Sequence, residues 1–331
     1  MWRAAFGTMS RYNGRALGKD SAMKLLITGM AGFIGMHTAK AFMNKGYEVV
    51  GIDNYNEYYD PNLKWARAQE LDATLHNIDL LERDKLIDFL YAENPNAVIH
   101  LAGYPGVRFS LEQPELYMAN NIKGTHHLID ACEMLAIDKV LYASTSSVNT
   151  GPIPFKEDPP GQAKHPYAMT KAANESMFNY SRIDSTTGLR FFTAYGPWGR
   201  PDMALYKFVD NIVHGTEIEV YNNGEMTRDF TYIDDIVDGI IIAFESMKPG
   251  ENEIYNIGYG ERVQLMDFVR EIEKNLGREA NIRYSPMHPA DNKDTWSDTT
   301  KLQALGYKPK VSIEEGVAKF VEWYKSYYKV N

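Results

Sequence analysis

The stretch MKLLITGMAGFIG, which runs from Met23 to Gly35, decides the fold of this chain. Its first half is a short apolar run that ends in glycine, a pattern typical of a buried strand. Glycines recur at Gly29, Gly32 and Gly35 with the spacing GxxGxxG, and a helical pattern follows as far as Gly46, a residue type that commonly ends helices. The stretch therefore predicts a strand, a tight glycine loop and a helix in succession.

Strand-like runs recur downstream and alternate with helical patterns. The runs are YEVVGIDN, ATLHNI, AVIHLAG and KVLYAST, and the regular alternation weakens after about Gly188. Strands that alternate with helices form a parallel sheet with helices on both faces, and right-handed crossovers put the ligand at the carboxyl ends of the strands. We therefore predict an α/β fold, a Rossmann-type doubly wound parallel sheet with a smaller mixed α/β C-terminal lobe.

The composition argues against several classes of partner and of binding site. The formal net charge of -9 repels phosphate backbones, so we expect no nucleic-acid partner. The chain has one cysteine, Cys132, which we expect to be buried on a helix, so it can form neither an internal disulfide nor a CxxC metal site. No run approaches the roughly 20 apolar residues of a membrane span, and residues 1–22 lack the apolar centre of a secretory signal. We expect a cytoplasmic protein without a metal or membrane partner, and a disordered extension over residues 1–22.

An acidic residue ends the strand that follows the glycine loop. Such a loop lets the backbone approach a pyrophosphate, which then lies at the positive end of the next helix. A carboxylate at Asp53 can bind both ribose hydroxyls of an adenosine and repels a 2′-phosphate, so the pattern predicts NAD rather than NADP. Asp79 and Leu80 follow the next strand and could meet the adenine edge, although a solvated loop acid is nearly as good an interpretation.

A second group of residues can move a proton. Tyr167 and Lys171 lie four positions apart on a helix that begins after Pro166, so they share one face. A phenol with a pKa of about 10 is a weak base, but a nearby ammonium and a positive nicotinamide ring favour its phenolate form. The hydroxyl run Ser144–Ser147 ends a strand and can orient a substrate hydroxyl, with turn formation as the alternative.

Together these motifs resemble the extended short-chain dehydrogenase/reductase family, which includes the NAD-dependent epimerases and dehydratases. The resemblance rests on the glycine loop, the HLAG motif at residues 100–103, the hydroxyl run and the Tyr-x-x-x-Lys pair, and it covers nearly the whole chain. Within the family, GLRFFTAYGPWGRPDMALYKF (188–208) and RDFTYIDDIVDGI (228–240) look like UDP-glucuronate 4-epimerases. The segment Arg200–Met203 is the most telling part of this similarity.

The resemblance implies reversible epimerisation at C4 of UDP-glucuronate, with NAD held tightly throughout. Tyr167 would take the proton of the 4-hydroxyl while hydride passes to NAD, and Lys171 would assist it. The 4-keto sugar would then turn, and hydride would return to its other face. Thr145 would bridge the 4-hydroxyl and the tyrosine. By the same correspondence, the C5 carboxylate would meet Ser146, Ser147 and Thr193.

The resemblance also assigns the remaining contacts. Arg228 resembles the arginine on the UDP pyrophosphate, Arg200 could counter the sugar carboxylate, and Arg108 lies near the phosphates or the carboxylate. Further substrate contacts are expected at Met203, Tyr221 and Asp291. The expected NAD contacts are Gly29, Gly32, Phe33, Ile34, Gly35, Asp53, Asn54, Asp79, Leu80, Leu101, Ala102 and Lys171.

Domain limits and an oligomer follow from the same family. We expect residues 23–190 to bind NAD with 233–258 returning to that domain, and 191–232 with 259–331 to bind the nucleotide sugar. The family implies a homodimer through the helices around residues 120–134 and 168–181. Apolar contacts there could come from Met118, Leu128, Met134, Met177 and Phe178, although a core-facing stripe is an equal interpretation.

Alternatives remain within and beyond this activity. A 4,6-dehydratase carries an acid pair, and a UDP-glucuronate decarboxylase a glutamate, where this chain has Ser146 and Ser147. A UDP-glucose 4-epimerase carries asparagine in place of Thr193. UDP-glucuronate 4-epimerase is therefore the leading interpretation. Another UDP-sugar epimerase or the decarboxylase comes second, and a non-catalytic NAD-binding regulator is the remote alternative.

The chain departs from the family pattern in three places. Asn149 stands where the family has a tyrosine, which predicts the loss of an aromatic wall near the nicotinamide. The run Gly103–Pro105 replaces the usual Ala-Gln-Ala and should reshape that loop. The segment 291–298, with the sequence DNKDTWSD, differs where contacts with the uridine are expected.

Overall fold

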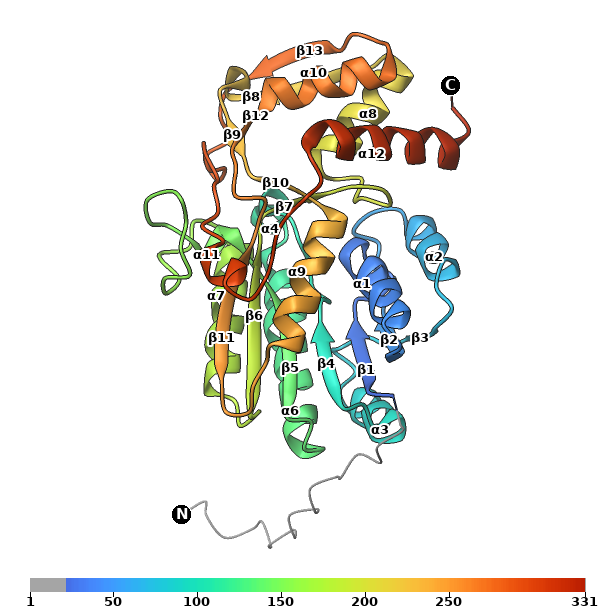
Figure 1. The fold of residues 1–331 in the computed structure, drawn as a ribbon, viewed down its shortest axis with the longest axis vertical. Helices are drawn as coiled ribbons and strands as arrows, with labels where there is room; N and C mark the ends of the chain where they lie inside the picture. The colour runs from blue at the N-terminus through green and yellow to red at the C-terminus, as the bar shows by residue number, and fades with distance from the viewer. Residues whose placement is uncertain (1–21, 331) are drawn as a thin grey trace, which may run out of the picture.

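The computed structural model describes residues 22–330, so the extension predicted at residues 1–22 lies almost entirely outside the described residues. A seven-stranded sheet with the order β11-β6-β5-β4-β1-β2-β3 forms the centre of the molecule, and all its neighbouring strands are parallel (Figure 1). This doubly wound order confirms the predicted fold class. The strands are β1 (Lys24–Thr28), β2 (Glu48–Asp53), β3 (Thr74–Asn77), β4 (Ala97–His100), β5 (Lys139–Thr145), β6 (Ser185–Phe191) and β11 (Asn252–Ile257).

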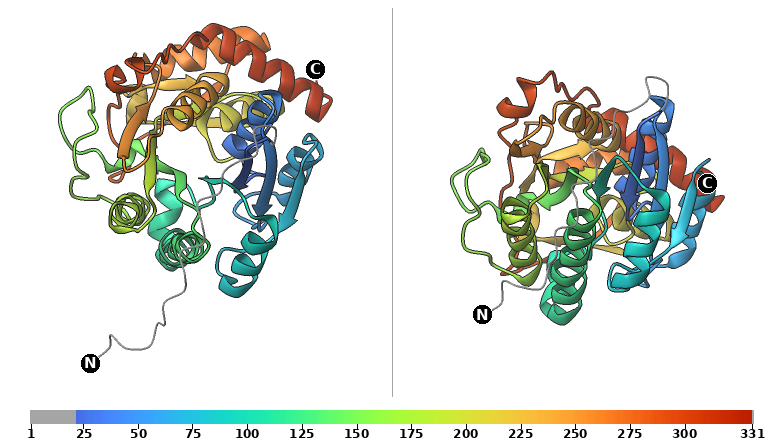
Figure 2. Two further views of the ribbon diagram at one scale, coloured as in Figure 1. Left: turned by 60° about the horizontal axis from the view of Figure 1, so that its bottom comes forward. Right: turned by 90° about the horizontal axis from the view of Figure 1, so that it is seen from below.

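Helices cover both faces of the large sheet (Figure 2). Leu25 and Ile27 of β1 pack in the core formed with α1 and α9, whereas Leu26 packs in the core formed with α3, α6 and α7. Because both faces are buried, the strands read as apolar runs rather than as alternating patterns. The helices that surround the sheet are α1 (Phe33–Asn44), α2 (Pro61–Gln69), α3 (Arg83–Glu93), α6 (Thr125–Met134), α7 (Pro166–Tyr180) and α9 (Ile233–Glu245).

A smaller mixed lobe lies at the carboxyl ends of these strands, at the top of Figure 1. It contains three short strand pairs: β7 with β10 and β8 with β13 are parallel, and β9 with β12 is antiparallel. The chain leaves the large sheet after β6 and returns to it through α9 and β11. The elements of the lobe are β7 (Thr193–Tyr195), α8 (Ala204–His214), β8 (Glu217–Tyr221), β9 (Thr227–Arg228), β10 (Phe230–Tyr232), β12 (Val263–Gln264), α10 (Leu265–Leu276), β13 (Asn281–Ser285) and α12 (Ile313–Tyr328).

Four shorter helical segments complete the fold around the site. They are α4 (Val107–Glu112), α5 (Pro114–Tyr117), the π-helix η1 (Met118–Gly124) and the 3-10 turn η2 (Ser146–Val148). Another 3-10 turn, η3 (Asn222–Gly224), and the helix α11 (Thr300–Gln303) lie in the later part of the chain. Among residues 22–330, no helix is both long and apolar enough to cross a membrane.

The helices expected to form a dimer face are only partly exposed. Leu128 and Phe178 are 0% and 1% exposed and belong to the core beneath the sheet, so their prediction as intersubunit contacts was wrong. Met118 and Met134 are 42% and 58% exposed. Cys132 is buried on α6, as predicted.

Candidate active site

One cavity of about 1090 Å³ lies between the carboxyl ends of the large sheet and the smaller lobe. All of the residues singled out from the sequence for catalysis, cofactor binding and substrate binding line it. They lie at the ends of separate strands, on α7 and in the lobe. A doubly wound sheet binds its ligand at the carboxyl ends of the strands where the strand order reverses, so residues from several separate segments meet there. The structure thus brings the predicted residues together, whereas the role of each one stays a prediction.

The glycines of the loop allow it to pack closely against neighbouring backbone. Gly29 has φ +70°, and a Cβ there would lie 2.8 Å from the Cα of Ala102. A Cβ at Gly35 would lie 2.1 Å from the carbonyl oxygen of Gly29. The following helix α1 begins at Phe33, and its N-cap residue is Gly32, so no side chain caps its first amides. Such free amides at a helix N-terminus suit a pyrophosphate, so the residues present fit a dinucleotide.

Asp53 joins this loop to the end of β2. Its carboxylate accepts hydrogen bonds from the backbone N–H of Ala31 at 3.0 Å and of Tyr55 at 2.9 Å. Burial raises the pKa of Asp53, while these bonds and the charge of Lys64 oppose that rise. A carboxylate has about four acceptor positions, so two remain for the ribose hydroxyls. Nearby, the carboxylate of Asp79 accepts a hydrogen bond from the side chain of Asn54 at 2.8 Å, at the place where the adenosine is predicted.

Tyr167 and Lys171 lie on α7, which begins at a proline and is capped by the imidazole of His165. The pKa of Tyr167 is raised by burial, and a hydrogen bond with Thr145 and the charge of Arg200 lower it. Lys171 donates to the carbonyl of Ala143 at 3.1 Å, and burial lowers its pKa to about 8. The charge of Arg200 thus favours the phenolate of Tyr167, while the Lys171 ammonium is hydrogen-bonded to the backbone of β5.

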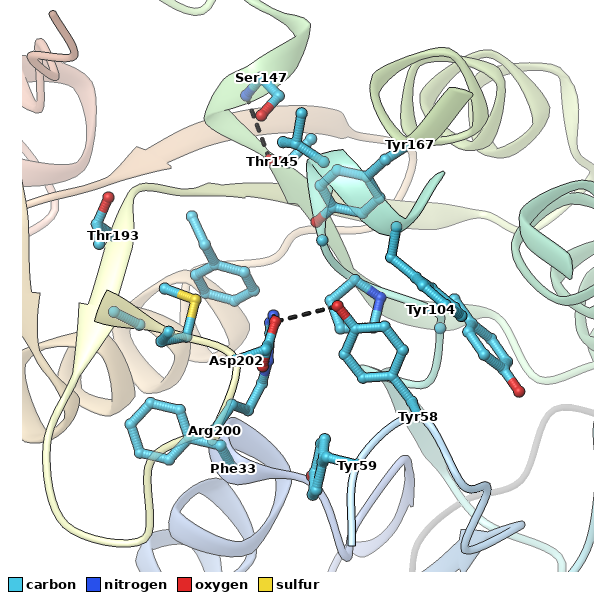
Figure 3. Close-up of a pocket in the computed structure, with 18 of the residues that line it drawn as sticks. Phe33, Tyr58, Tyr59, Tyr104, Thr145, Ser147, Tyr167, Thr193, Arg200 and Asp202 are labelled. Carbon is cyan, nitrogen blue, oxygen red and sulfur yellow. Dashed lines mark hydrogen bonds and ion pairs between the residues drawn. The ribbon is translucent and has the colours of Figure 1, made fainter. Parts of the chain in front are cut away.

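The hydroxyl run forms a short turn beside the tyrosine (Figure 3). Thr145 accepts from the backbone N–H of Ser147 at 3.2 Å, and Ser146 and Ser147 are half-buried at the cavity wall. The side chain of Asn149 donates to the carbonyl of Ser146 and accepts from Arg190 at 2.8 Å. Asn149 therefore anchors the turn from behind, where sequence reasoning expected only the loss of an aromatic wall.

A buried ion pair lies behind that turn. The Arg190 guanidinium pairs with Glu175 at 2.8 Å, and Glu175 also accepts a hydrogen bond from Ser144. Arg190 and Glu175 are 1% and 7% exposed. Removing one member of such a pair would leave an unpaired buried charge, so the network fixes the end of β5 firmly.

Across the cavity, Arg200 forms a bidentate ion pair with Asp202 (Figure 3). The hydroxyl of Tyr58 donates to the same carboxylate at 3.0 Å. Burial acts to raise the pKa of Asp202, but Arg200 and Tyr58 hold that pKa below its ordinary value. The sequence predicted Arg200 as a site residue, but it did not predict the pairing with Asp202 or the hydrogen bond from Tyr58 to that carboxylate. Tyr58 lies 144 positions from Asp202, so no local pattern could have joined them.

The far end of the cavity is cationic and aromatic. Arg108 pairs with Asp291 at 2.8 Å, and its guanidinium lies 3.7 Å from the ring centroid of Tyr221. Arg228 donates to the carbonyls of Thr227 and Lys293 at 2.8 and 2.9 Å. The divergent segment 291–298 is thereby attached to the predicted pyrophosphate end.

The comparisons with known proteins agree with this geometry. The model of the NAD dependent epimerase/dehydratase family matches residues 25–258. Protein CapI of Staphylococcus aureus is 41% identical, over 93% of this chain and all of that protein. The probable UDP-glucuronate 4-epimerase of Rhizobium meliloti is also 41% identical, over 93% of this chain and 98% of that one. The structure of the UDP-glucuronic acid 4-epimerase of Bacillus cereus, in complex with UDP-glucuronic acid and NAD, is 35% identical with a TM-score of 0.86 and covers 92% and 100% of the two chains.

Proposed function

This chain belongs to the NAD-dependent epimerase/dehydratase family, and we propose that within it the chain interconverts UDP-glucuronate and UDP-galacturonate. One observation carries the proposal of an acidic sugar. The turn beside Tyr167 offers only hydroxyl side chains, from Thr145 to Ser147, and the guanidinium of Arg200 lines the same cavity. Hydroxyl donors and a cation suit a carboxylate on the sugar.

The residues of the chain divide the reaction between them. NAD, when bound by the glycine loop and Asp53, would supply the acceptor for the C4 hydride and the donor that returns it. Tyr167 receives the proton of the 4-hydroxyl in the first half of the turnover and returns it in the second. Thr145 relays this proton between the 4-hydroxyl and Tyr167. Because both hydride and proton are returned, the net change is inversion at C4.

The carboxylate on C5 needs to be held. Oxidation at C4 makes the sugar a β-keto acid, which loses carbon dioxide when its carboxylate bond aligns with the carbonyl orbitals. Ser146, Ser147 and Thr193 can donate hydrogen bonds to that carboxylate and keep the bond out of alignment. This is a positional requirement, so small errors in geometry should appear as decarboxylation.

Proton NMR of a single incubation tests the proposal. The purified protein is incubated with UDP-glucuronate without added NAD, and UDP-galacturonate is expected to accumulate to equilibrium. A UDP-pentose with released carbon dioxide would identify a decarboxylase, and net NADH would identify a dehydrogenase. The Tyr167→Phe variant is the control, because it should keep NAD and lose conversion.

We also propose a homodimer through the exposed parts of η1, α6 and α7. Met118 and Met134 are exposed apolar side chains on these helices, and Met177 is partly buried there. Exposed apolar side chains on adjacent helices are typical of a subunit interface.

A further inference from the structure

Arg67 on α2 is a buried cation whose hydrogen bonds go to neutral oxygen atoms. Its side chain is 0% exposed. The guanidinium donates to the carbonyls of Trp198 at 2.7 Å, Gly199 at 3.1 Å and Ala31 at 3.3 Å, and also to the hydroxyl of Tyr59. Removing a guanidinium from water costs free energy, and these hydrogen bonds offset part of that cost.

Two of the carbonyls that Arg67 binds, those of Trp198 and Gly199, belong to a segment that is contacted from two sides. The preceding carbonyl, of Pro197, accepts from the imidazole of His37 on α1 at 3.0 Å. Three consecutive carbonyls of the segment are thus directed at the helices of the large sheet. On its other side, the ring of Trp198 packs against Trp323 and Tyr327 of α12, with ring centroids 5.3 and 5.0 Å apart.

The segment 197–199 leads directly to Arg200, which lines the cavity. The backbone N–H of Met203 donates to the carbonyl of Arg200 at 3.1 Å to close a turn. The same Arg67 guanidinium contacts Ala31, which lies within the glycine loop. One side chain therefore spans the cofactor loop and the backbone that carries Arg200.

We infer that Arg67 is a positioning residue that fixes the segment 196–203, and with it Arg200, relative to the glycine loop. This inference rests on the proposed function in assigning Arg200 to the sugar acid. The planar fork of arginine offers five donors in fixed directions, whereas lysine offers a single flexible ammonium. The three donors of a lysine all lie on one nitrogen and cannot reproduce the bonds of the fork to four separate acceptors, so the geometry requires the fork and not the charge alone.

A double-mutant cycle on kcat/KM tests the inference with the holoenzyme. Arg67→Met and Arg200→Met should each lower kcat/KM by about 10²-fold, the cost of a misplacement near 1 Å. The double variant should fall within about twofold of Arg200→Met alone, because Arg67 acts through Arg200. The matched control is Lys40→Met, which removes an exposed cation between α1 and α2 and should keep wild-type activity. Multiplicative losses in the double variant would overturn the inference.

Product partition gives a readout that a merely structural residue would not change. On UDP-glucuronate, Arg67→Lys and Arg67→Met should release a UDP-pentose while the NAD content stays at the wild-type level. Wild-type product ratio and kcat in folded Arg67→Lys would contradict the inference. If Arg67→Met does not fold, His37→Ala takes its place, because it frees the same segment without removing a charge. The cycle is run with whichever UDP-sugar the wild type epimerises, so a failure of the proposed substrate is seen in the wild type alone.

Discussion

At the scale of single residues, two opposite charges affect the pKa of the Tyr167 phenol. Arg200 lowers its pKa and Asp202 raises it, although both act in the background of a burial effect that raises it further. We therefore expect the ion pair between those two residues to influence the proposed proton transfer by Tyr167. Neighbouring charges of this kind are a common means of matching a catalytic pKa to the working pH.

The two members of that pair should shift the pH profile in opposite directions. Tyr167 acts as a base only when ionised, so activity rises with pH through its pKa. Arg200→Met should move this acid limb of kcat/KM to higher pH, because a cation that favours the phenolate is lost. Asp202→Asn should move the limb to lower pH, because an opposing anion is lost. Shifts of the acid limb in the same direction in the two variants, when kcat/KM is measured from about pH 5 to 9, would contradict this account.

At the scale of elements, α7 depends on an unusual cap. Its first turn is held by Nδ1 of His165, which accepts from the N–H of Ala168 at 3.1 Å. Only the neutral imidazole has a free lone pair for this bond. Burial lowers the pKa of His165, so the folded protein favours that neutral form. The position of Tyr167, two residues later, follows from this helix start.

The cap should be measurable as stability. His165→Ala should lower the free energy of unfolding by about 1 kcal/mol, while His165→Asn, which can also cap a helix, should lower it less. Because the pKa of His165 is lower in the folded state than in the unfolded state, its contribution is present above the unfolded pKa and is lost as pH falls through the folded one. Urea unfolding at neutral and acidic pH checks both points. An equal loss in the two variants would show that the imidazole does not act as a cap.

At the scale of the whole molecule, the candidate site lies where the large sheet and the smaller lobe meet. The large sheet and its covering helices supply the glycine loop and Tyr167, and the smaller lobe supplies Arg228 and Tyr221, all around one cavity. The proposed dimer face lies on the exposed parts of η1, α6 and α7, and α7 also carries Tyr167, so we expect association to stabilise that helix.

Light scattering coupled to size exclusion tests the proposed dimer. The wild type should elute with twice the mass of its 37.7 kDa chain. Met134→Glu places a charge on the exposed face and should give a monomer, whereas Tyr91→Glu, on the exposed side of α3, should not. A wild type that is monomeric at micromolar concentration would contradict the proposal.

The local pattern of the chain determined the fold class and the cofactor. The glycine loop, Asp53 at the end of the next strand and the Tyr167–Lys171 spacing are all short-range features, and the periods of strand and helix translate them directly into geometry. The tertiary structure alone decided the partners of Arg200, the contacts of Arg67 and the role of Asn149. From its local sequence, Arg67 resembles an ordinary solvated cation on a polar helix. Its hydrogen-bond acceptors lie up to 132 positions away in the chain. Which distant groups meet a buried charge depends on how the layers pack, and no local periodicity encodes that.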